Sequence, residues 1–507
     1  MATPEISEER RVRIANADEE LLASLGYKQE FKRTFTPFEV FGVAFSIISL
    51  VPSIASSLVY AMPNGGPASM VWGWFAASIF IMFVGLAMAE LASAAPTSGG
   101  LYFWTWTYSS PKYKKILAWL VGYANTIGTI AGIASIDWGC AVQVMAAAAI
   151  GSGGKFVATT GKFPRQTYAV YLAILFTHAV VCSLATSLLA RLQTVYVILN
   201  LVLFLAILIA LPVATPAQFK NSASYALGDF TNLSGYPNGF AFFLSWLAPV
   251  WTIGMLINVL EGQFTLIRII KARTIVACIS AKKRKSCFFE SPQPKGLKEM
   301  ITNRSNAAVA VPWSIVGAIG ISGILGTAMN IAIAFCMGTN VESILNSKIG
   351  QPLAAIFFNS FGEKATLGIW SVVVITQWGM GSSIVLSTSR QVFAFSRDGA
   401  MPFSNILYRM NEYTETPVNT VWFSVIIAAL LGLLAFAGEV AIMAVFSYII
   451  PIGARFVFNE DNFTPGPFTL GPFGLPVAAI AIAFMSFITI VLLFPSTPAP
   501  GVTDMNY

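Results

Sequence analysis

Residues 46–57 read SIISLVPSIASS, so one proline and five serines stand in the middle of a long apolar run. The run as a whole, residues 38–61, is long enough to cross a bilayer, because about 20 apolar residues span the roughly 30 Å hydrocarbon layer. A proline removes a backbone hydrogen bond, which destabilises a helix in lipid unless the freed groups line a cavity. The stretch therefore indicates either a kinked, packed helix or a discontinuous helix whose freed amides bind an anionic group.

The composition of the whole chain is typical of a membrane protein. Hydrophobic residues make up 56% of the 507 residues and charged residues only 10%, whereas soluble domains carry about 25% charged residues. The net charge of +7 does not indicate nucleic-acid binding, since the basic residues lie mostly between the apolar runs. The five cysteines have no CxxC or CxxH spacing, so we expect no disulfide framework, no metal site and no cofactor.

Apolar runs of helical length follow one another along the chain, bounded by charged residues, Pro or Gly. The third run is long enough to be strongly tilted, and the tenth is near the lower limit of length for a span. We expect an all-α polytopic membrane protein with about 11 transmembrane helices, near residues 38–61, 70–92, 116–149, 167–189, 194–215, 238–260, 312–336, 366–389, 417–437, 438–457 and 475–495.

Basic residues in the loops set the orientation of these helices, because Lys and Arg are retained on the cytoplasmic side. With the N-terminus in the cytosol, the inner segments hold 24 of the 30 Lys and Arg residues and the outer loops hold 6. We therefore expect a cytoplasmic N-terminal tail over residues 1–37, a transmembrane domain over residues 38–495 and a short C-terminal tail over residues 496–507.

Two further segments lie where expected helices reach the cytosol. Residues 90–104 read ELASAAPTSGGLYFW, in which a proline and two glycines permit a tight turn after the second helix. Residues 389–402 read SRQVFAFSRDGAMP and follow the eighth helix, with Arg390 and Arg397 on one helix face. From physical chemistry alone, these segments are a turn and a solvated cytoplasmic cap.

Together with residues 25–33, LGYKQEFKR, these segments occur in an order that resembles the fungal GABA-permease and choline-permease branch of the amino acid–polyamine–organocation superfamily. The likeness covers residues 22–254 and resumes over residues 305–507. The resemblance implies a leucine-transporter-like fold of two inverted five-helix repeats, with broken first and sixth helices. It also implies proton-coupled uptake of a substrate by alternating access.

Carried over by position, the resemblance places the substrate site on the first and sixth helices. We expect backbone amides of the unwound first helix to hold the carboxylate of a small amino acid. GABA or a related amino acid is favoured, and choline or another amino acid is the alternative. The expected substrate-binding residues are Ser49, Leu50, Val51, Pro52, Ser53, Ile54, Trp251, Thr252, Ile253 and Gly254.

Acidic residues at membrane depth are candidates for coupling. An aspartate there costs about 2.5–3.5 kcal/mol on insertion scales, so Asp137 is a candidate for proton or substrate coupling, and Glu90 is a second. The alternative for Asp137 is a structural hydrogen bond to Gln143 or to a hydroxyl group. For His178, the only histidine, we favour a packed residue over a proton relay.

Small and polar residues mark two of the later helices. Gln377, Trp378 and Ser382 give the eighth helix a polar patch that is a candidate for lining the transport pathway. Glycines recur every three residues from Gly317 to Gly326 in the seventh helix and predict the close approach of another helix.

The likeness is interrupted over residues 255–304, which include the basic run AKKRK at residues 281–285. A block of like charge is not expected to cross lipid and is typical of a cytoplasmic loop. Our hypothesis is that this block is a retained intron. The tenth helix is also short, and the twelfth helix of the family pattern is missing. A transport-inactive product of a mis-spliced gene is therefore a further alternative, and a channel or nutrient sensor is another.

The expected partners are a small amino acid, a proton and the lipid bilayer, and no nucleic acid. We expect a multi-pass integral protein of the plasma membrane, with the vacuolar membrane as the alternative. The sequence offers no convincing nucleophile–base pair and no phosphate-binding loop, so we do not expect an enzyme.

Overall fold

The computed structural model describes residues 48–254, 306–433, 443–495 and 498, apart from short gaps at 98, 154–155, 157–162, 185, 412, 415 and 459–462. Within these residues the regular structure is entirely helical. The expected N-terminal tail, the 255–304 block and all but one residue of the expected C-terminal tail lie outside the described residues. What the sequence indicates for these three segments stays a prediction.

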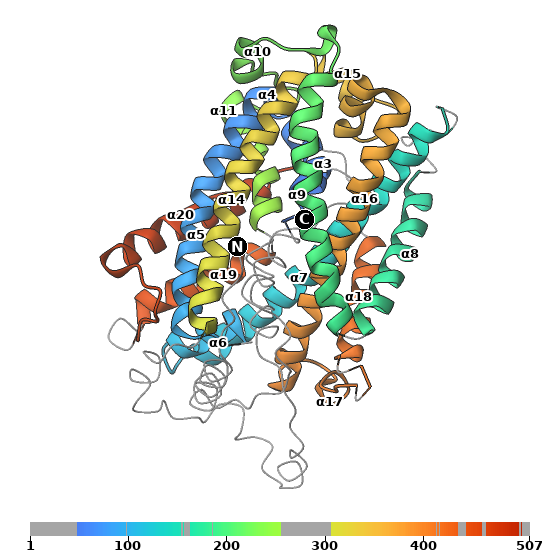
Figure 1. The fold of residues 1–507 in the computed structure, drawn as a ribbon. Coiled ribbons are helices and arrows are strands. Elements are labelled where there is room, and N and C mark those ends of the chain that lie inside the picture. Colours follow the sequence, from blue (N-terminus) through green and yellow to red (C-terminus); the bar gives the residue numbers. More distant parts are fainter. Residues whose placement is uncertain are drawn as a thin grey trace, which may run out of the picture.

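The helices follow the expected order along the chain (Figure 1). The longer ones are α3 (Leu50–Ala61), α5 (Trp74–Ala94), α6 (Gly100–Tyr108), α7 (Lys114–Gly151), α8 (Phe163–Ser183), α9 (Thr186–Ala214), α11 (Asn238–Ser245), α14 (Asn306–Cys336), α16 (Pro352–Arg397), α18 (Val418–Leu431), α19 (Met443–Phe458) and α20 (Gly474–Leu492). Short helical turns are α4 (Gly66–Ala68), the π-helix η1 (Ser69–Gly73), η2 (Ala217–Phe219), α10 (Ala223–Gly228), α15 (Val341–Leu345), α17 (Ser404–Leu407) and η5 (Gly471–Phe473).

Each expected apolar run contains a described helix, and residues 38–47, 185, 255–260 and 434–442 of these runs lie outside the described residues. Seven described helices are long and apolar enough to cross a membrane, and three shorter apolar helices accompany them. The sixth run is formed by α11, an irregular turn at Trp246 and the helical residues 247–254. The prediction of an all-α polytopic protein is therefore confirmed.

Two helices are longer than a bilayer requires. Helix α7 has 38 residues and, at about 1.5 Å per residue, is roughly 57 Å long, and it crosses the bundle obliquely (Figure 1). Helix α16 bends at Gly362, where φ is 72° and ψ is 179°. Its first part therefore forms an additional short helix before the expected eighth span, which begins near residue 366.

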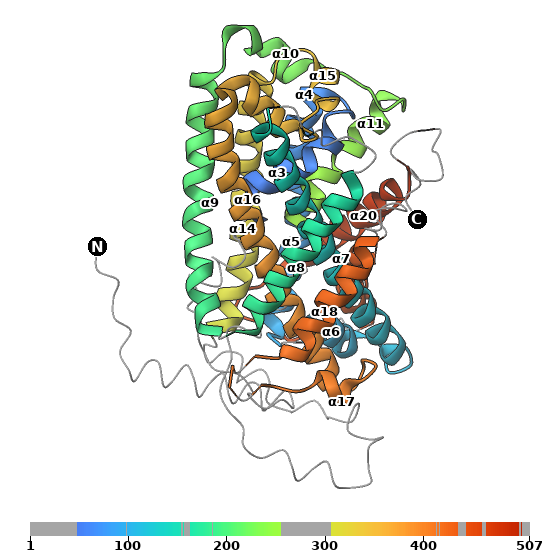
Figure 2. The same ribbon diagram turned by 90° about the vertical axis from the view of Figure 1, so that its right-hand side faces the viewer.

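The loops gather at two opposite ends of the bundle, and which end faces the cytosol stays a prediction. Helices α4, α10 and α15 lie at one end, and α6 and α17 lie at the other, in both views (Figures 1 and 2). At the first end, Leu233 N donates to Pro63 O at 2.8 Å and Asn221 N donates to Phe335 O at 2.9 Å. At the second end, Tyr102 Oη donates to Asp398 Oδ2 at 2.7 Å, which joins the two sequence segments 90–104 and 389–402.

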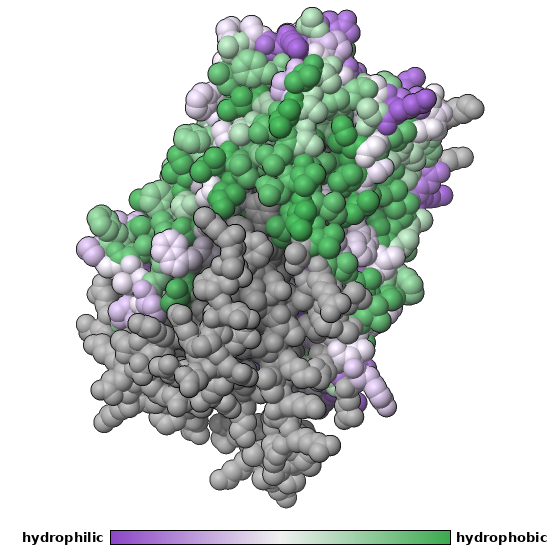
Figure 3. Space-filling view, in the orientation of Figure 1, coloured by the Kyte–Doolittle hydropathy of each residue, from purple (hydrophilic) through white to green (hydrophobic). Residues whose placement is uncertain are grey.

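The middle of the bundle presents an apolar surface. Hydrophobic residues cover the central part of the face seen in Figure 3, and hydrophilic residues collect at its upper end. On α9, Ile198, Leu205 and Ile209 are 56%, 46% and 66% exposed. Large apolar side chains exposed along a spanning helix are suited to contact with lipid tails.

Glycines bring α5 and α14 together. A Cβ added to Gly326 would lie 2.3 Å from Trp74 Nε1, and one added to Gly323 would lie 3.1 Å from Ser78 Cβ. A Cβ on Gly85 would in turn lie 2.3 Å from Ile319 Cδ1. The close helix approach predicted from the repeated glycines is therefore confirmed, and its partner is α5.

Candidate functional site

The first helix is interrupted at Ser49. The backbone of Ser49 lies in the left-handed region, with φ 35° and ψ 65°, and α3 begins only at the next residue. Residues other than glycine adopt this region where their surroundings hold them there. The first N–H groups of a helix have no intrahelical acceptor, so the amides of Leu50 and Val51 point toward the break, at the positive end of the helix dipole.

The irregular part of the first span is shorter than the Ser49–Ile54 stretch that we expected to be unwound. Among the described residues of this segment only Ser49 departs from helical geometry, and residues 50–54 form the first turns of α3. Pro52 has no N–H, so it cannot donate the usual helical hydrogen bond to Ile48 O. The Ser53 hydroxyl donates to that carbonyl instead, at 2.6 Å, and Ser53 N donates to Ser49 O at 3.0 Å.

Helices α7 and α16 face the break. From α7, Gln143 Nε2 donates to Pro52 O at 3.1 Å and to Ser56 Oγ at 3.0 Å. From α16, Thr376 O accepts a long hydrogen bond from Ser49 Oγ at 3.4 Å. The first turn of α3 is thus fixed by polar contacts to two neighbouring helices.

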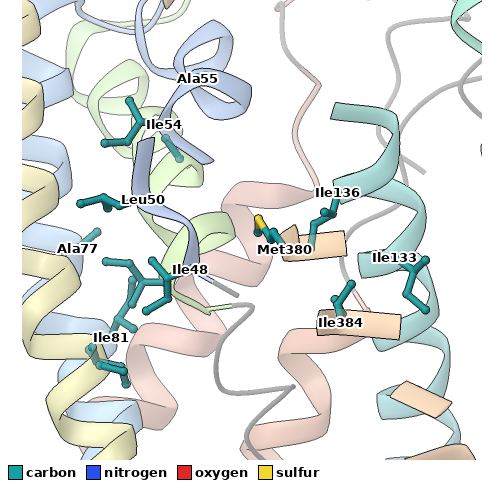
Figure 4. Close-up of a cluster of buried hydrophobic side chains, with 14 of the residues drawn as sticks. Ile48, Leu50, Ile54, Ala55, Ala77, Ile81, Ile133, Ile136, Met380 and Ile384 are labelled. Carbon is teal, nitrogen blue, oxygen red and sulfur yellow. The ribbon is translucent and has the colours of Figure 1, made fainter. Parts of the chain in front are cut away.

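A buried apolar layer surrounds the same turn. Figure 4 shows Ile48 and Ile54 of the first span beside Ala77 and Ile81 of α5. Met380 of α16 and Ile136 of α7 lie across from them, and each of these side chains is at most 2% exposed. Because this layer excludes water, the partial charge at the start of α3 is only weakly screened. A negatively charged group placed at the break would be held strongly.

A small cavity lies beside α3, among α3, η1, the sixth span and α14. Its lining includes Ser69 Oγ and Trp74 Nε1, which have no hydrogen-bond partner among the described residues. The cavity is about the size of one water molecule, which could satisfy these two donors.

The expected residues of the sixth span are helical in the structure and approach α7. Trp251 Nε1 donates to Ser135 Oγ at 3.0 Å. Thr252 and Ile253 are buried, and Thr252 Oγ1 has no hydrogen-bond partner among the described residues. Gly254 is the last described residue before the 255–304 block.

The three residues of the polar patch of α16 each contact a different neighbour, and their role in lining the pathway stays a prediction. Gln377 Nε2 donates to Ile136 O at 3.0 Å, and Ser382 Oγ donates to Gly379 O of its own helix at 2.8 Å. Trp378 points toward α8, where its Nε1 donates to Thr177 Oγ1 at 2.9 Å. Thr376 and Met380, rather than these three residues, face the break.

Asp137 is fully buried and pairs with His178. Asp137 Oδ2 lies 3.0 Å from His178 Nδ1, and His178 Nε2 lies 2.9 Å from Trp378 O. Both side chains are 0% exposed. The alternative bond from Asp137 to Gln143 is not formed, because Gln143 binds the first helix.

Glu90 lies near the C-terminal end of α5 in an ion pair with Arg455 of α19. Its other oxygen accepts hydrogen bonds from Thr469 Oγ1 and Leu470 N, both at 3.0 Å. Glu90 therefore has partners on both oxygens, and it ties α5 to α19 and to the segment before α20.

Several residues at the site were not singled out from the sequence. Thr376 and Met380 follow helical spacing and face the break, but the spacing alone does not reveal which face of α16 packs on the first helix. For His178 the signal is its place in an apolar helix, which by itself favours a packed side chain. Its partner lies 41 positions away in the chain, so the pairing depends on how α7 and α8 pack.

Comparison with known proteins identifies the family. The sequence model of the amino acid permease family matches residues 35–261 and 298–507. The unmatched residues between them lie inside the block that interrupts the family pattern.

Similar proteins are permeases of fungi and a plant. The chain is 35% identical to a GABA-specific permease of Saccharomyces cerevisiae, over 97% of this chain and 81% of the relative. It is 33% identical to an amino-acid permease of Schizosaccharomyces pombe, over 98% of this chain and 83% of the relative. It is 30% identical to an amino-acid permease of Arabidopsis thaliana, over 96% of this chain and 90% of the relative. Together with a helical bundle whose first span is broken, these matches show that the chain belongs to the amino acid permease family of membrane transporters.

Proposed function

We propose that this chain takes up GABA or a related ω-amino acid by proton-coupled alternating access. The observation that carries the proposal is the left-handed backbone at Ser49, directly before α3 and among buried apolar side chains. We expect the amides of Leu50 and Val51 to be available at this helix start. Amides at a helix start are a ready-made site for an anion, and the substrate carboxylate is the anion of an amino acid.

The preference for GABA as substrate is supported by one relative and by the chemistry of the sixth span. The first-named relative is a GABA-specific permease. An ω-amino acid carries an ammonium group several bonds away from its carboxylate, so this group needs a separate acceptor. The buried Thr252 hydroxyl lacks a partner among the described residues and is our candidate for that acceptor. Choline and other amino acids remain the alternative substrates.

Competition for uptake tests recognition of the carboxylate. The purified chain is reconstituted into proteoliposomes, and uptake of labelled GABA is measured with an excess of unlabelled GABA, butylamine or choline. Butylamine is the matched control because it keeps the chain length and the amine but lacks the carboxylate. We expect competition by GABA alone. Equal competition by butylamine or choline would contradict binding of the carboxylate at the break.

A pH gradient tests proton coupling. An inside-alkaline gradient is expected to drive accumulation of GABA, and a protonophore is expected to abolish it. Accumulation that is insensitive to both conditions would reject the proton as the coupling ion. Uptake no greater than in empty vesicles would favour the transport-inactive product.

We also propose the plasma membrane as the location, with the vacuolar membrane as the alternative. Fractionation of cells that express a tagged chain would separate the two membranes. Recovery of the chain with vacuolar markers alone would contradict the proposal.

A further inference from the structure

We propose that the coupled proton is carried by the Asp137–His178 pair, in which the histidine is a functional partner of the carboxylate. This inference rests on the proposed proton-coupled uptake. The pair joins α7 to α8, and its two side chains are fully buried at membrane depth.

The partners of the histidine define where its protons lie. His178 Nε2 lies 2.9 Å from Trp378 O, and a backbone carbonyl only accepts hydrogen bonds, so Nε2 carries a hydrogen. His178 Nδ1 lies 3.0 Å from Asp137 Oδ2, so one further proton is held between these two atoms. The pair is neutral with that proton, whether it resides on nitrogen or on oxygen, and carries one negative charge without it.

Because the pair is buried, its proton can be exchanged only when water reaches the pair. A net charge in a dry, apolar interior is strongly disfavoured, so the closed interface retains the proton. Asp137 Oδ1 has no hydrogen-bond partner among the described residues, so deprotonation would leave a carboxylate poorly satisfied. The proton is therefore taken up and released when the interface of α7, α8 and α16 admits water on one side or the other.

The described side chains that pack closest to the pair are ordinarily neutral at neutral pH. The packed segment of α16 from 377 to 382 and all of α18 contribute no acidic or basic side chain. The titratable groups near the pair are Cys140 of α7, Tyr171 and Cys182 of α8, and Tyr196 of α9, next to Trp378. Thiols and phenols are ordinarily neutral at neutral pH. Arg390 lies further along α16 and is the nearest permanent cation on that helix.

Helix α16 connects the pair to the substrate site. Thr376 and Met380 face the break in the first helix, whereas Trp378 and Gly381 face the pair. Both sets of contacts lie within two turns of one helix. A shift of α16 that opens the pair to water therefore also changes the contacts of the broken helix. Glu90, the other acidic candidate, has no such connection to the break.

Transport measurements separate this inference from the proposed function. Asp137→Asn and His178→Gln remove the shared proton while keeping similar side-chain volumes. We expect both variants to lose accumulation driven by a pH gradient but to retain exchange of internal for external GABA, which needs no net proton movement. Cys140→Ala and Cys182→Ala are the matched controls on α7 and α8 and are expected to keep both activities.

A steric variant tests the pair without changing either member. A Cβ on Gly381 would lie 2.1 Å from Asp137 Oδ1 and 2.5 Å from His178 Cε1, whereas a Cβ on Gly368 of the same helix meets nothing within 4 Å. We expect Gly381→Ala to lose gradient-driven accumulation and Gly368→Ala to keep it. Full gradient-driven accumulation by Asp137→Asn or His178→Gln would overturn the inference. Absence of exchange in the unmodified chain would instead contradict the proposed function.

A spectroscopic measurement keeps the inference testable even if transport is absent. The chain contains a single histidine, so nitrogen NMR of ¹⁵N-histidine protein, purified with a tag that lacks histidine, reports His178 alone. We expect Nε2 to stay protonated and the Nδ1 signal to show a shared proton that Asp137→Asn removes. A histidine that titrates like a free imidazole, or a spectrum unchanged by Asp137→Asn, would refute the pair as a proton carrier.

Discussion

At the scale of single residues, the break in the first helix depends on a hydroxyl group that replaces a backbone donor. Pro52 leaves Ile48 O without its usual N–H, and Ser53 Oγ supplies the hydrogen bond at 2.6 Å. A carbonyl left unbonded in a buried, apolar position costs about 1–3 kcal/mol. Ser53 therefore has a structural role at the site in addition to any contact with substrate.

Replacement of Ser53 by alanine tests this role. Ser53→Ala is expected to lower the stability of the purified protein by about 1–3 kcal/mol, because Ile48 O loses its donor. The control is Ser78→Ala, whose hydroxyl donates to Trp74 O within the same helix and is not needed to replace a missing amide. The thermal unfolding midpoint in detergent measures both effects. Equal midpoints for the two variants would argue against the role of Ser53.

The sequence identifies the residues of the site better than their partners. A proline among serines predicts a discontinuous helix, and an aspartate at membrane depth predicts a function, because each residue is costly in lipid by itself. The contact of Gln143 with Pro52 and that of His178 with Asp137 each join two separate helices. Whether such a contact forms depends on how the two helices are rotated relative to each other. Helical spacing gives the faces of one helix but does not reveal which neighbour each face meets.

At the scale of helices, α5 and α14 form a pair that tolerates little additional volume. Gly326 faces the rigid indole ring of Trp74, whereas Gly320 faces the flexible end of Met82, with a Cβ distance of 3.3 Å to its Cε. The repeated glycines predict close packing from the sequence, but only the structure shows that these positions differ in what they meet.

Alanine at these two glycines is expected to have unequal effects. Gly326→Ala should destabilise the protein by about 1–3 kcal/mol, because the indole ring cannot move away without disturbing its neighbours. Gly320→Ala should be nearly neutral, since a methionine side chain adapts and alanine favours a helix. Unfolding midpoints of the two variants provide the comparison. A larger loss for Gly320→Ala would contradict this account of the packing.

The ion pair of Glu90 and Arg455 connects α19 to the C-terminal end of α5. Removal of one partner leaves a buried charge, for which about 3–5 kcal/mol of destabilisation is typical. Arg455→Leu should therefore destabilise the protein more than the double variant Glu90→Gln with Arg455→Leu, in which neither charge remains. Unfolding midpoints of both variants test this order. A double variant that is less stable than Arg455→Leu would rule out the charge as the cause.

At the scale of the whole molecule, the expected fold is recovered because its signal is distributed over many residues. Apolar runs, loop charges and glycine spacing each constrain several helices, so local errors have little effect on the overall bundle. The bend of α16 at Gly362 was not predicted because a single glycine in a polar stretch resembles an ordinary loop. The family match in turn divides at the segment where the sequence pattern stops.

The hypothesis of a retained intron stays open and has a direct test. Sequencing of the mature transcript across codons 250–310 shows whether residues 255–304 are encoded in a continuous message. A mature message that contains the block would contradict the hypothesis. A spliced message without it would support a gene-model error.

Deletion of residues 262–297 tests what the unmatched segment contributes to transport. The segment contains eight Lys or Arg residues and one Glu, and we expect it to stay outside the hydrocarbon because charged residues are costly there. Its removal joins the two regions that match the family. We therefore expect the shortened chain to exchange GABA at least as fast as the full chain in proteoliposomes. A control with the segment replaced by an uncharged polar linker of equal length separates loop length from charge. If the deletion variant folds but exchanges GABA more slowly than both the full chain and the linker control, the segment itself takes part in transport.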